Sequence, residues 1–304
     1  MQPNQFSETA IGVASVRAHH HENDHPLVFD DPYAGILLDE TDRARALGYS
    51  LALVSNADRS RAEAIDDPVV RKGALMRANP FTGSILVTYR LADEWLRKAI
   101  VEGIEQCVVL GAGLDSTSLR FANHAGPLRI LEVDHPTTQL HKRHRIEEQG
   151  LWPRPGTEFV AVDFHTTDLT TELGASSYLV DRPALFNWLG VIYFLNADAV
   201  LHVFETIHRM SAPGSIVVFD IYESGTERPT EERDADVRMA SLVGALGEPH
   251  VKGLSAESLM SSLRAMGYIE LDLVRPEEVE PWHRTARGLG YSFISGSWIA
   301  RVRR

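Results

Sequence analysis

The sequence predicts an α/β fold, built on a mostly parallel sheet with helices on both faces. Three observations support this prediction. From about residue 104 onward, apolar runs of strand length alternate with amphipathic segments of helix length, which is the pattern of successive β-α-β units. Several runs carry apolar residues on both faces of the expected strand, as is typical of central strands that are covered on both sides. The first run, at residues 106–110, leads directly into a turn that contains Gly111 and Gly113.

The expected strands and helices follow one another along this part of the chain. The strands are expected at 106–110, 128–133, 158–162, 184–188, 215–220, 268–274 and 292–302. Helical spacing of apolar residues predicts helices at 115–123, 137–148 and 198–210. A further helix is expected from an N-cap at Ser255 to Met266, where Gly267 stops it. The sheet would therefore have seven strands.

Two stretches depart from the β-α pattern. Residues 1–103 show no clear strand and contain short helical segments, such as 8–20 and 91–102, with breaks at Asp30-Asp31-Pro32 and Asn79-Pro80. Residues 223–252 are rich in charged side chains and contain two prolines. We therefore expect a helical cap at 1–103, a core at 104–304, and a lid-like insertion at 223–252 at the ligand end of the sheet.

The composition is acidic, with 42 Asp and Glu against 30 Lys and Arg among 304 residues and a formal net charge of −12. A general nucleic-acid binder needs a basic surface for phosphate, so we expect no nucleic-acid partner. No apolar stretch approaches the ~20 residues of a membrane span. Residues 1–7 also lack the basic-then-apolar pattern of a signal peptide. We therefore expect a cytoplasmic protein without a membrane partner.

Cysteine and histidine usage argues against a metal centre. The single cysteine, Cys107, lies within an apolar run, so the chain has neither a disulfide framework nor a multi-cysteine metal site. His19, His20 and His21 are adjacent, with His25 close by. Neighbouring positions on a helix point ~100° apart, so three adjacent histidines do not share one face, and we expect no metal.

The strongest local signal is a series of residues that follow the first three core strands. Gly111 and Gly113 permit a tight turn and the close approach of a ligand to the backbone, although a lone Gly-x-Gly is equally compatible with a plain strand–helix turn. Asp134 ends the second strand, 21 residues beyond Gly113, where an acid can accept hydrogen bonds from both ribose hydroxyls. After the third strand, Asp163 can accept from the amine of an adenine, and Phe164 offers an apolar wall.

Two adenosine-containing ligands fit this series, and the turn distinguishes them. A dinucleotide-binding Gly-x-Gly-x-x-Gly turn has a third glycine, where this chain has Ser116. Asp115 stands at the start of the following helix and would repel a phosphate there. S-adenosylmethionine has no phosphate and carries a sulfonium and an ammonium group. The residues therefore favour S-adenosylmethionine, with an NAD-dependent oxidoreductase as the alternative.

Several motifs occur together in a characteristic order: LGAGLDS at 110–116, EVDHP at 132–136, VDF at 162–164, SETAIGVASVRA at 7–18 and DDPYA at 30–34. This set, which extends over nearly the whole chain, resembles the leucine carboxyl methyltransferase-like family of class I S-adenosylmethionine-dependent methyltransferases. The resemblance is to the bacterial, largely actinobacterial branch, which includes polyketide O-methyltransferases. It implies a Rossmann-like, seven-stranded, mostly parallel sheet with one antiparallel strand at the end and an added N-terminal helical cap.

The resemblance also implies roles for individual residues. The residues that match the family's cofactor-binding positions are Arg90 for the methionine carboxylate, Gly111 and Gly113 for the glycine turn, Asp134 for the ribose, and Asp163 with Phe164 for the adenine. One position departs from the family, because Leu189 replaces an acid near the amino group of the cofactor. The ammonium group would then need another acceptor, such as a backbone carbonyl near Gly111 or Asn187. This departure also leaves open a catalytically degenerate binding protein.

The expected function is an S-adenosylmethionine-dependent O-methyltransferase that acts on a carboxylate or a hydroxyl of a small, polyketide-like molecule. A carboxylate acceptor, which the family precedent favours, needs no general base, whereas a hydroxyl acceptor needs one. The sequence does not assign that base. Aromatic residues where the sheet meets the cap are the candidates for acceptor contacts: Tyr33, Trp188, Tyr193, Tyr222 and Tyr291.

Overall fold

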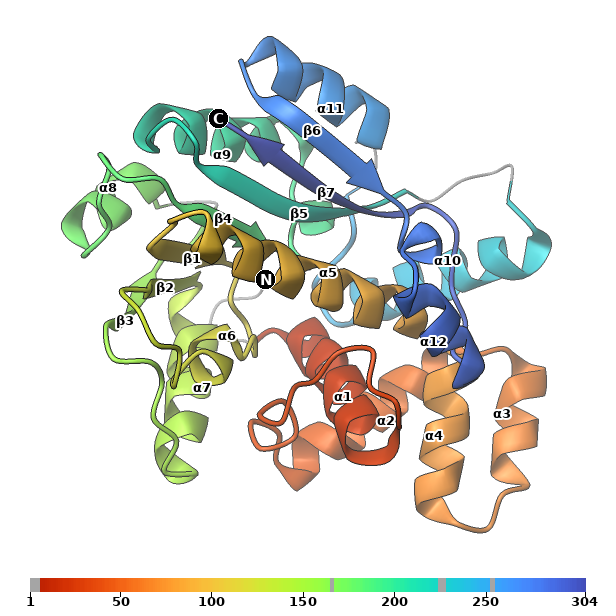
Figure 1. Cartoon of the computed structure of the whole chain (residues 1–304). Coiled ribbons are helices and arrows are strands. Elements are labelled where there is room, and N and C mark those ends of the chain that lie inside the picture. The colour runs from red at the N-terminus through yellow and green to blue at the C-terminus, as the bar shows by residue number, and fades with distance from the viewer. Residues whose placement is uncertain (1–5, 165–166, 224–227, 252–254) are drawn as a thin grey trace.

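The computed structural model describes residues 6–164, 167–223, 228–251 and 255–304. Within these residues, seven strands form one sheet in the order β3-β2-β1-β4-β5-β7-β6 (Figure 1). The strands are β1 (Gln106–Leu110), β2 (Arg129–Asp134), β3 (Thr157–Ala161), β4 (Leu185–Trp188), β5 (Ile216–Tyr222), β6 (Ile269–Val274) and β7 (Ser297–Arg303). The first five strands pair in parallel, and β7 pairs antiparallel with both β5 and β6. The predicted α/β fold is confirmed.

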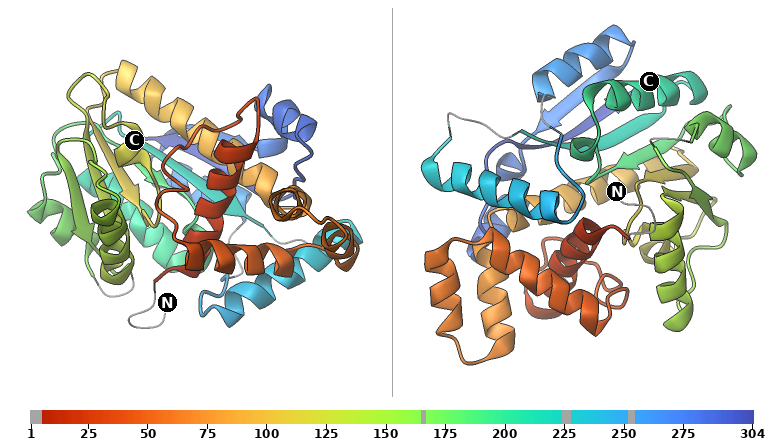
Figure 2. Two further views of the ribbon diagram at one scale, coloured as in Figure 1. Left: turned by 90° about the horizontal axis from the view of Figure 1, so that it is seen from below. Right: turned by 180° about the vertical axis from the view of Figure 1, so that it is seen from behind.

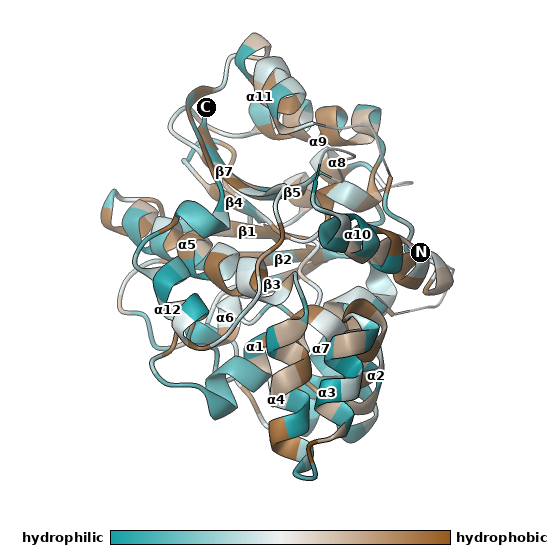
Figure 3. Cartoon of the chain, turned by 90° about the vertical axis from the view of Figure 1, so that its right-hand side faces the viewer, coloured by the Kyte–Doolittle hydropathy of each residue, from teal (hydrophilic) through white to brown (hydrophobic). Residues whose placement is uncertain are grey.

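Alternating side chains of β1 supply two separate hydrophobic clusters, one on each face of the sheet. Val108 and Leu110 pack into the cluster that contains the helix α9 (Ala197–Met210). Cys107 and Val109 pack into the cluster that contains the helix α5 (Thr82–Val101). Successive residues of a strand point to opposite faces, so a central strand between two helical layers is apolar throughout. Figure 3 shows these hydrophobic strands between helices that also carry hydrophilic residues.

The helices of the core are unevenly distributed over the two faces. On the α9 face lie also α8 (Leu169–Ala175) and α11 (Ala256–Ala265), which both contact α9. The helix α7 (Pro136–Glu148) packs against β2 and β3. Between β6 and β7 the chain forms α12 (Trp282–Gly288), which contacts α5. The helix expected at 198–210 is thus α9, and the one expected at 137–148 is α7.

The N-terminal segment forms four helices before α5: α1 (Glu8–Asn23), α2 (Glu40–Leu53), α3 (Asn56–Glu63) and α4 (Pro68–Ala78). Polar residues cap their first turns, since the side chain of Ser7 accepts from the Ala10 amide and Asp39 forms a capping box with Asp42. The helix α10 (Thr230–Ala245) of the 223–252 segment lies beside α2 (Figure 2). Arg238 Nε donates to the Leu53 carbonyl across this contact, at 2.9 Å.

Several boundaries differ from the predicted ones. The helix expected at 115–123 is only the four-residue α6 (Thr117–Arg120). The reason is Arg154, whose buried guanidinium bonds the carbonyls of Phe121 and His124 and so fixes this stretch as turns. The strand expected from 292 begins at Ser297, because the carbonyl of Ser292 accepts from the Gly83 amide of α5, at 3.0 Å, instead of joining the sheet.

The division into a cap at 1–103 and a core at 104–304 stays a prediction, as does the lid role of 223–252. Parts of these ranges, namely 1–5, 165–166, 224–227 and 252–254, lie outside the described residues. The helix α5 belongs by sequence to the predicted cap, but Ala92, Leu96 and Ala99 lie in the cluster against the sheet. Among the described residues, no helix has both the length and the apolar composition that crossing a membrane requires.

Candidate functional site

A cavity of about 500 Å³ lies at the carboxyl ends of β1, β2, β4 and β5. Its walls come from the loops that follow these strands and from α1, α2, α10 and the first turns of α5. Ligands of open α/β sheets bind at this edge, in the crevice outside the carboxyl ends of the strands. The cavity is therefore the candidate functional site.

The turn after β1 brings backbone to the wall of the cavity. Gly111 and Gly113 both line it, with φ of +64° and +45°, a conformation that L side chains rarely adopt. A Cβ at Gly111 would lie 2.3 Å from Cγ2 of Val191, so the turn also has no room for a side chain there. The two glycines are thus required by the backbone geometry.

The acids predicted after β2 and β3 lie on the same cavity. Asp134 accepts hydrogen bonds from the amides of Gly113 and His135, the latter at 2.6 Å, which ties the end of β2 to the glycine turn. Burial raises the pKa of the Asp134 carboxyl to about 6, although these two hydrogen bonds oppose the shift. Asp163 and Phe164 also line the cavity. The structure thus brings together all the predicted cofactor-binding residues except one.

The exception is Arg90, which does not line the cavity. Its Nε donates to Glu94 Oε1 at 2.8 Å, and its guanidinium lies over the ring of Trp282, 4.0 Å from the ring centre. Thr88 and Tyr89 of the same helix do line the cavity, and the next residue of a helix points ~100° away. The structure therefore does not bring Arg90 to the cavity, and its predicted role at the methionine carboxylate stays a prediction.

A different arginine occupies the cavity wall. Arg17 of α1 is 1% exposed, lines the cavity, and pairs with Asp31 while its Nη2 donates to the Leu114 carbonyl at 2.8 Å. Its buried Nε has no hydrogen-bond partner among the described residues. Sequence reasoning missed it, although Arg17 lies within the 7–18 motif, next to Ala18 on the buried side of α1.

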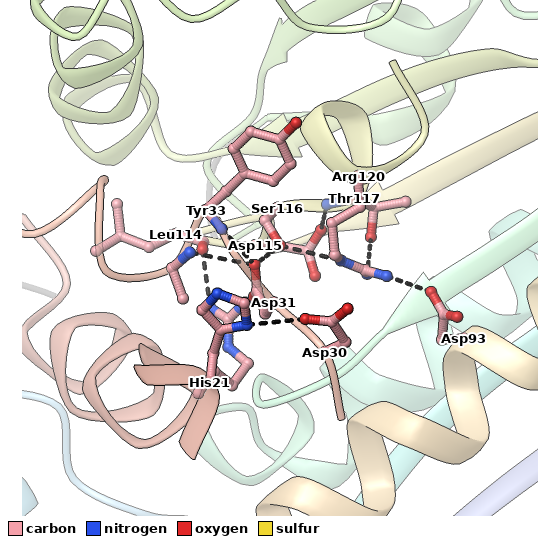
Figure 4. Close-up of polar contacts among 12 residues, drawn as sticks. His21, Asp30, Asp31, Tyr33, Asp93, Leu114, Asp115, Ser116, Thr117 and Arg120 are labelled. Carbon is pink, nitrogen blue, oxygen red and sulfur yellow. Dashed lines mark hydrogen bonds and ion pairs between the residues drawn. The ribbon is translucent and has the colours of Figure 1, made fainter. Parts of the chain in front are cut away.

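Beneath the glycine turn lies a network of charged side chains (Figure 4). Asp31 Oδ1 accepts from Ser116 Oγ at 2.7 Å, and Arg120 pairs with Asp93 of α5. Burial opposes the ionisation of Asp115, but the charges of Arg120 and of other nearby cations lower its pKa. The network holds α1, α5 and the turn in a single arrangement, and Asp115 remains negative beside the cavity.

Of the five aromatic residues proposed for acceptor contacts, Tyr193 and Tyr222 line the cavity. The other three do not line it. Trp188 is fully buried in the sheet core against Phe204, because β4 is a central strand. Tyr291 packs beside α5 and donates from its hydroxyl to Asp24.

The third, Tyr33, packs on the cluster formed by α1, α2 and α7. Its amide donates to Asp31 Oδ1 at 3.2 Å. This contact belongs to the turn that holds Asp31 toward Arg17. Tyr33 itself does not line the cavity.

The end of the cavity between α2, α5 and α10 is mostly apolar. The residues that line this part include Leu53, Phe81, Ile85, Met239, Leu242 and Val243. The ring of His250 is tilted against that of Tyr193 and lies edge-on to that of Phe194, with ring centres 4.9 and 5.0 Å apart. Burial lowers the pKa of His250 to about 4, so this histidine is neutral at physiological pH. We call this part of the cavity the apolar lobe.

Sequence reasoning also missed Asp220, which follows Phe219, the strand partner of Trp188, on β5. It lines the cavity, and its Oδ1 accepts from the Gly190 amide at 2.7 Å. Burial raises the pKa of the Asp220 carboxyl to about 6. By contrast, Asn187, proposed as an alternative acceptor for an ammonium group, does not line this cavity. For Asp220, the only sign in the sequence was its position as an acid at the end of an apolar strand.

The raised pKa of Asp220 predicts a measurable pH dependence of stability. Its pKa is 3.8 in a model peptide and about 6 in the fold, so between these values the folded state binds more protons and the free energy of unfolding falls as the pH rises. Urea unfolding of the wild type and of Asp220→Asn at several pH values from 4 to 6 measures the effect. We expect the wild type to lose stability relative to the variant over this range. If the free energies of unfolding of the wild type and of Asp220→Asn change in parallel with pH, the raised pKa of Asp220 is contradicted.

The adjacent histidines have separate partners. His20 Nδ1 bonds Asp24 at 2.8 Å while its Nε2 accepts from the Val28 amide, and His21 Nδ1 bonds Asp30 at 2.8 Å. Across the described ranges, no three or more His, Cys, Asp or Glu side chains are grouped to hold a metal ion.

Comparisons with known proteins show the family to which this chain belongs. The family model described as leucine carboxyl methyltransferase matches residues 10–208, more than half of the chain. YktD of Bacillus subtilis (strain 168), named as a candidate S-adenosyl-L-methionine-dependent methyltransferase, is 26% identical over 92% of this chain and 91% of that protein. A Mycobacterium avium (strain 104) protein of similar name is 29% identical over 80% of this chain and 74% of that protein.

A solved structure of a candidate methyltransferase from Thermobifida fusca YX is similar in fold. It shares 16% sequence identity, with a TM-score of 0.50, over 85% of this chain and 98% of that chain. The family match extends from α1, with Arg17, through the glycine turn and Asp134 to α9. The chain therefore belongs to the leucine carboxyl methyltransferase family of class I S-adenosylmethionine-dependent methyltransferases.

Proposed function

We propose that this protein is an O-methyltransferase that transfers the methyl group of S-adenosylmethionine to a carboxylate or hydroxyl of a small, apolar, polyketide-like molecule. The observation that carries the proposal is the asymmetry of one cavity. The glycine turn, Asp134, Asp163 and Arg17 line the part next to β1, β2 and β3, which we call the polar side, and the apolar lobe lies between α2, α5 and α10. A polar, zwitterionic methyl donor and an apolar acceptor would meet between them.

The residues of the polar side fit the methyl donor. Gly111 and Gly113 leave backbone without side chains at the wall of the cavity, and the Asp134 carboxylate suits a ribose. The unpartnered Nε of Arg17 makes this arginine the candidate for the methionine carboxylate. S-adenosylmethionine supplies an electrophilic methyl group when bound. The task of the protein is then to position the acceptor oxygen and to exclude water from it.

The apolar lobe supports a small-molecule acceptor. Its aromatic and aliphatic side chains favour burial of hydrocarbon surface. Tyr193 and Tyr222 remain the candidates for polar contacts with that molecule, and the hydroxyl of Tyr222 already donates to Asp236.

Binding of S-adenosylhomocysteine, the product form of the donor, tests the proposal. We expect it to raise the melting temperature of the wild type, because a ligand that binds only the folded state stabilises it. Asp134→Ala is expected to abolish the shift, since the ribose hydroxyls lose their acceptor. Asp181→Ala, which removes an exposed acid away from the cavity, is the matched control and is expected to keep it.

The other two functions considered from the sequence predict different results. A nicotinamide dinucleotide that stabilises the wild type while S-adenosylhomocysteine does not would favour a dehydrogenase, which the family assignment argues against. Binding of S-adenosylhomocysteine without methyl transfer to any member of a broad panel of carboxylic acids and phenols would favour a degenerate binding protein.

A further inference from the structure

Asp220 is an acid of the cavity without a cationic partner. Its carboxylate accepts from the Gly190 amide at 2.7 Å, and no ion pair with a Lys, Arg or His is formed among the described residues. A carboxylate removed from water is costly unless a cation or several donors compensate it. One backbone amide leaves most of its acceptor capacity unused.

Three acids near the glycine turn form ion pairs, whereas Asp134 is held there by the amides of Gly113 and His135. Asp31 pairs with Arg17, Asp93 with Arg120, and Glu132 with Lys142. The described residues thus supply counter-ions to these three acids and supply none to Asp220. Because Asp220 also lines the cavity, a cationic group of a ligand can reach it.

The surroundings of Asp220 indicate which cationic group of a ligand it can bind. The Arg17 guanidinium lies over the ring of Tyr89, 4.7 Å from the ring centre. Burial raises the pKa of the Tyr89 hydroxyl, and the negative charge of Asp220 adds to this shift. Arg17, Tyr89 and Asp220 all line the cavity. A guanidinium and an unpaired carboxylate around one tyrosine are complementary to an amino-acid zwitterion. Asp115 is less suited to the cation, because Arg120, Lys142 and Arg17 already compensate its charge.

We propose that the Asp220 carboxylate binds the α-ammonium group of the methionine moiety of S-adenosylmethionine, with Arg17 as the partner of its carboxylate. The inference rests on the proposed function. It also accounts for Leu189, which precedes Gly190 at the end of β4: the negative charge absent at Leu189 is supplied by Asp220 on the adjacent strand β5.

The test compares two ligands that differ only in the amino-acid part. S-adenosylhomocysteine carries the ammonium group, and 5′-methylthioadenosine has the same adenosine and sulfur without it. Isothermal titration of Asp220→Asn is expected to show a loss of about tenfold or more in affinity for S-adenosylhomocysteine, the range of a charge-assisted hydrogen bond. The affinity for 5′-methylthioadenosine is expected to stay within about twofold of wild type.

Two further measurements sharpen the test. Asp220→Glu, which keeps the charge, is expected to retain more affinity for S-adenosylhomocysteine than Asp220→Asn does. The deaminated analogue of S-adenosylhomocysteine is expected to bind wild type and Asp220→Asn equally, because it has no group for Asp220 to bind. The asparagine keeps an acceptor for the Gly190 amide, and circular dichroism checks that the variant is folded.

Several outcomes would overturn the inference. An Asp220→Asn variant that binds S-adenosylhomocysteine as tightly as wild type but loses methyl transfer would make Asp220 a general base for the acceptor instead. Equal losses for both ligands would indicate a structural role. If wild type binds neither ligand, the proposed function itself fails, which separates that result from a failure at Asp220.

Discussion

Replacing Arg17 by methionine is expected to lower the free energy of unfolding by about 3–5 kcal/mol, the cost of removing one partner from a buried ion pair. Arg17 and Asp31 are 1% and 0% exposed, so the variant leaves a carboxylate inside the protein without its cation. The same change removes the hydrogen bond from α1 to the Leu114 carbonyl. Urea unfolding at pH 7 measures the loss.

The matched control is Arg90→Met. Arg90 pairs with Glu94 in a part-exposed geometry, and such pairs contribute below about 1 kcal/mol. Arg90→Met should therefore lower the free energy of unfolding several-fold less than Arg17→Met does. If the two variants lose equal stability, the assignment of Arg17 as the buried arginine of the site is wrong. The double variant Arg17→Met with Asp31→Asn should recover part of the loss, because no charge is then left unpaired.

Gly111→Ala is expected to cost about 2–5 kcal/mol of stability and to abolish binding of S-adenosylhomocysteine. The positive φ of Gly111 accounts for about 1–2 kcal/mol. The contact of the new Cβ with Val191 Cγ2, at 2.3 Å, adds about 1–3 kcal/mol of overpacking. Thermal and urea unfolding measure the stability, and calorimetric titration measures the binding.

Gly150→Ala separates the two contributions. Gly150 has φ of +58°, close to the +64° of Gly111, but a Cβ there would contact nothing within 4 Å. Its substitution should therefore cost only the backbone part. The double variant Gly111→Ala with Val191→Ala should recover the steric part, since the contacting methyl groups are gone. A Gly111→Ala variant no less stable than Gly150→Ala would show that Val191 moves aside freely.

The predicted sheet was correct in number, order of elements and approximate bounds because its signals are local. A strand that is apolar on both faces, such as Gln106–Leu110, has a pattern set by its own residues. The glycines and Asp134 were placed correctly at the cavity for a related reason. Residues that follow parallel strands lie at the same edge of the sheet, so the strand assignment positions them.

The positions of the predicted residues that do not line the cavity depend on the packing of helices. Arg90 and Thr88 belong to one helix, and which of them reaches the cavity depends on the rotation of α5 against the sheet. Tyr291 and Trp188 are aromatic residues near the ligand edge by sequence, but one donates to Asp24 of the N-terminal segment and the other lies in the core. Such contacts join segments far apart in the chain.

The sequence by itself therefore determined the α/β fold, the glycine turn, the acids after β2 and β3, and the family, because each rests on patterns within short segments. Only the tertiary structure decided that Arg17, and not Arg90, lines the cavity, and that Asp220 lines it without an ion pair to another described residue. The burial of a charge and the presence of its partner are properties of the folded surroundings, to which α1, α5 and β5 contribute from distant parts of the chain.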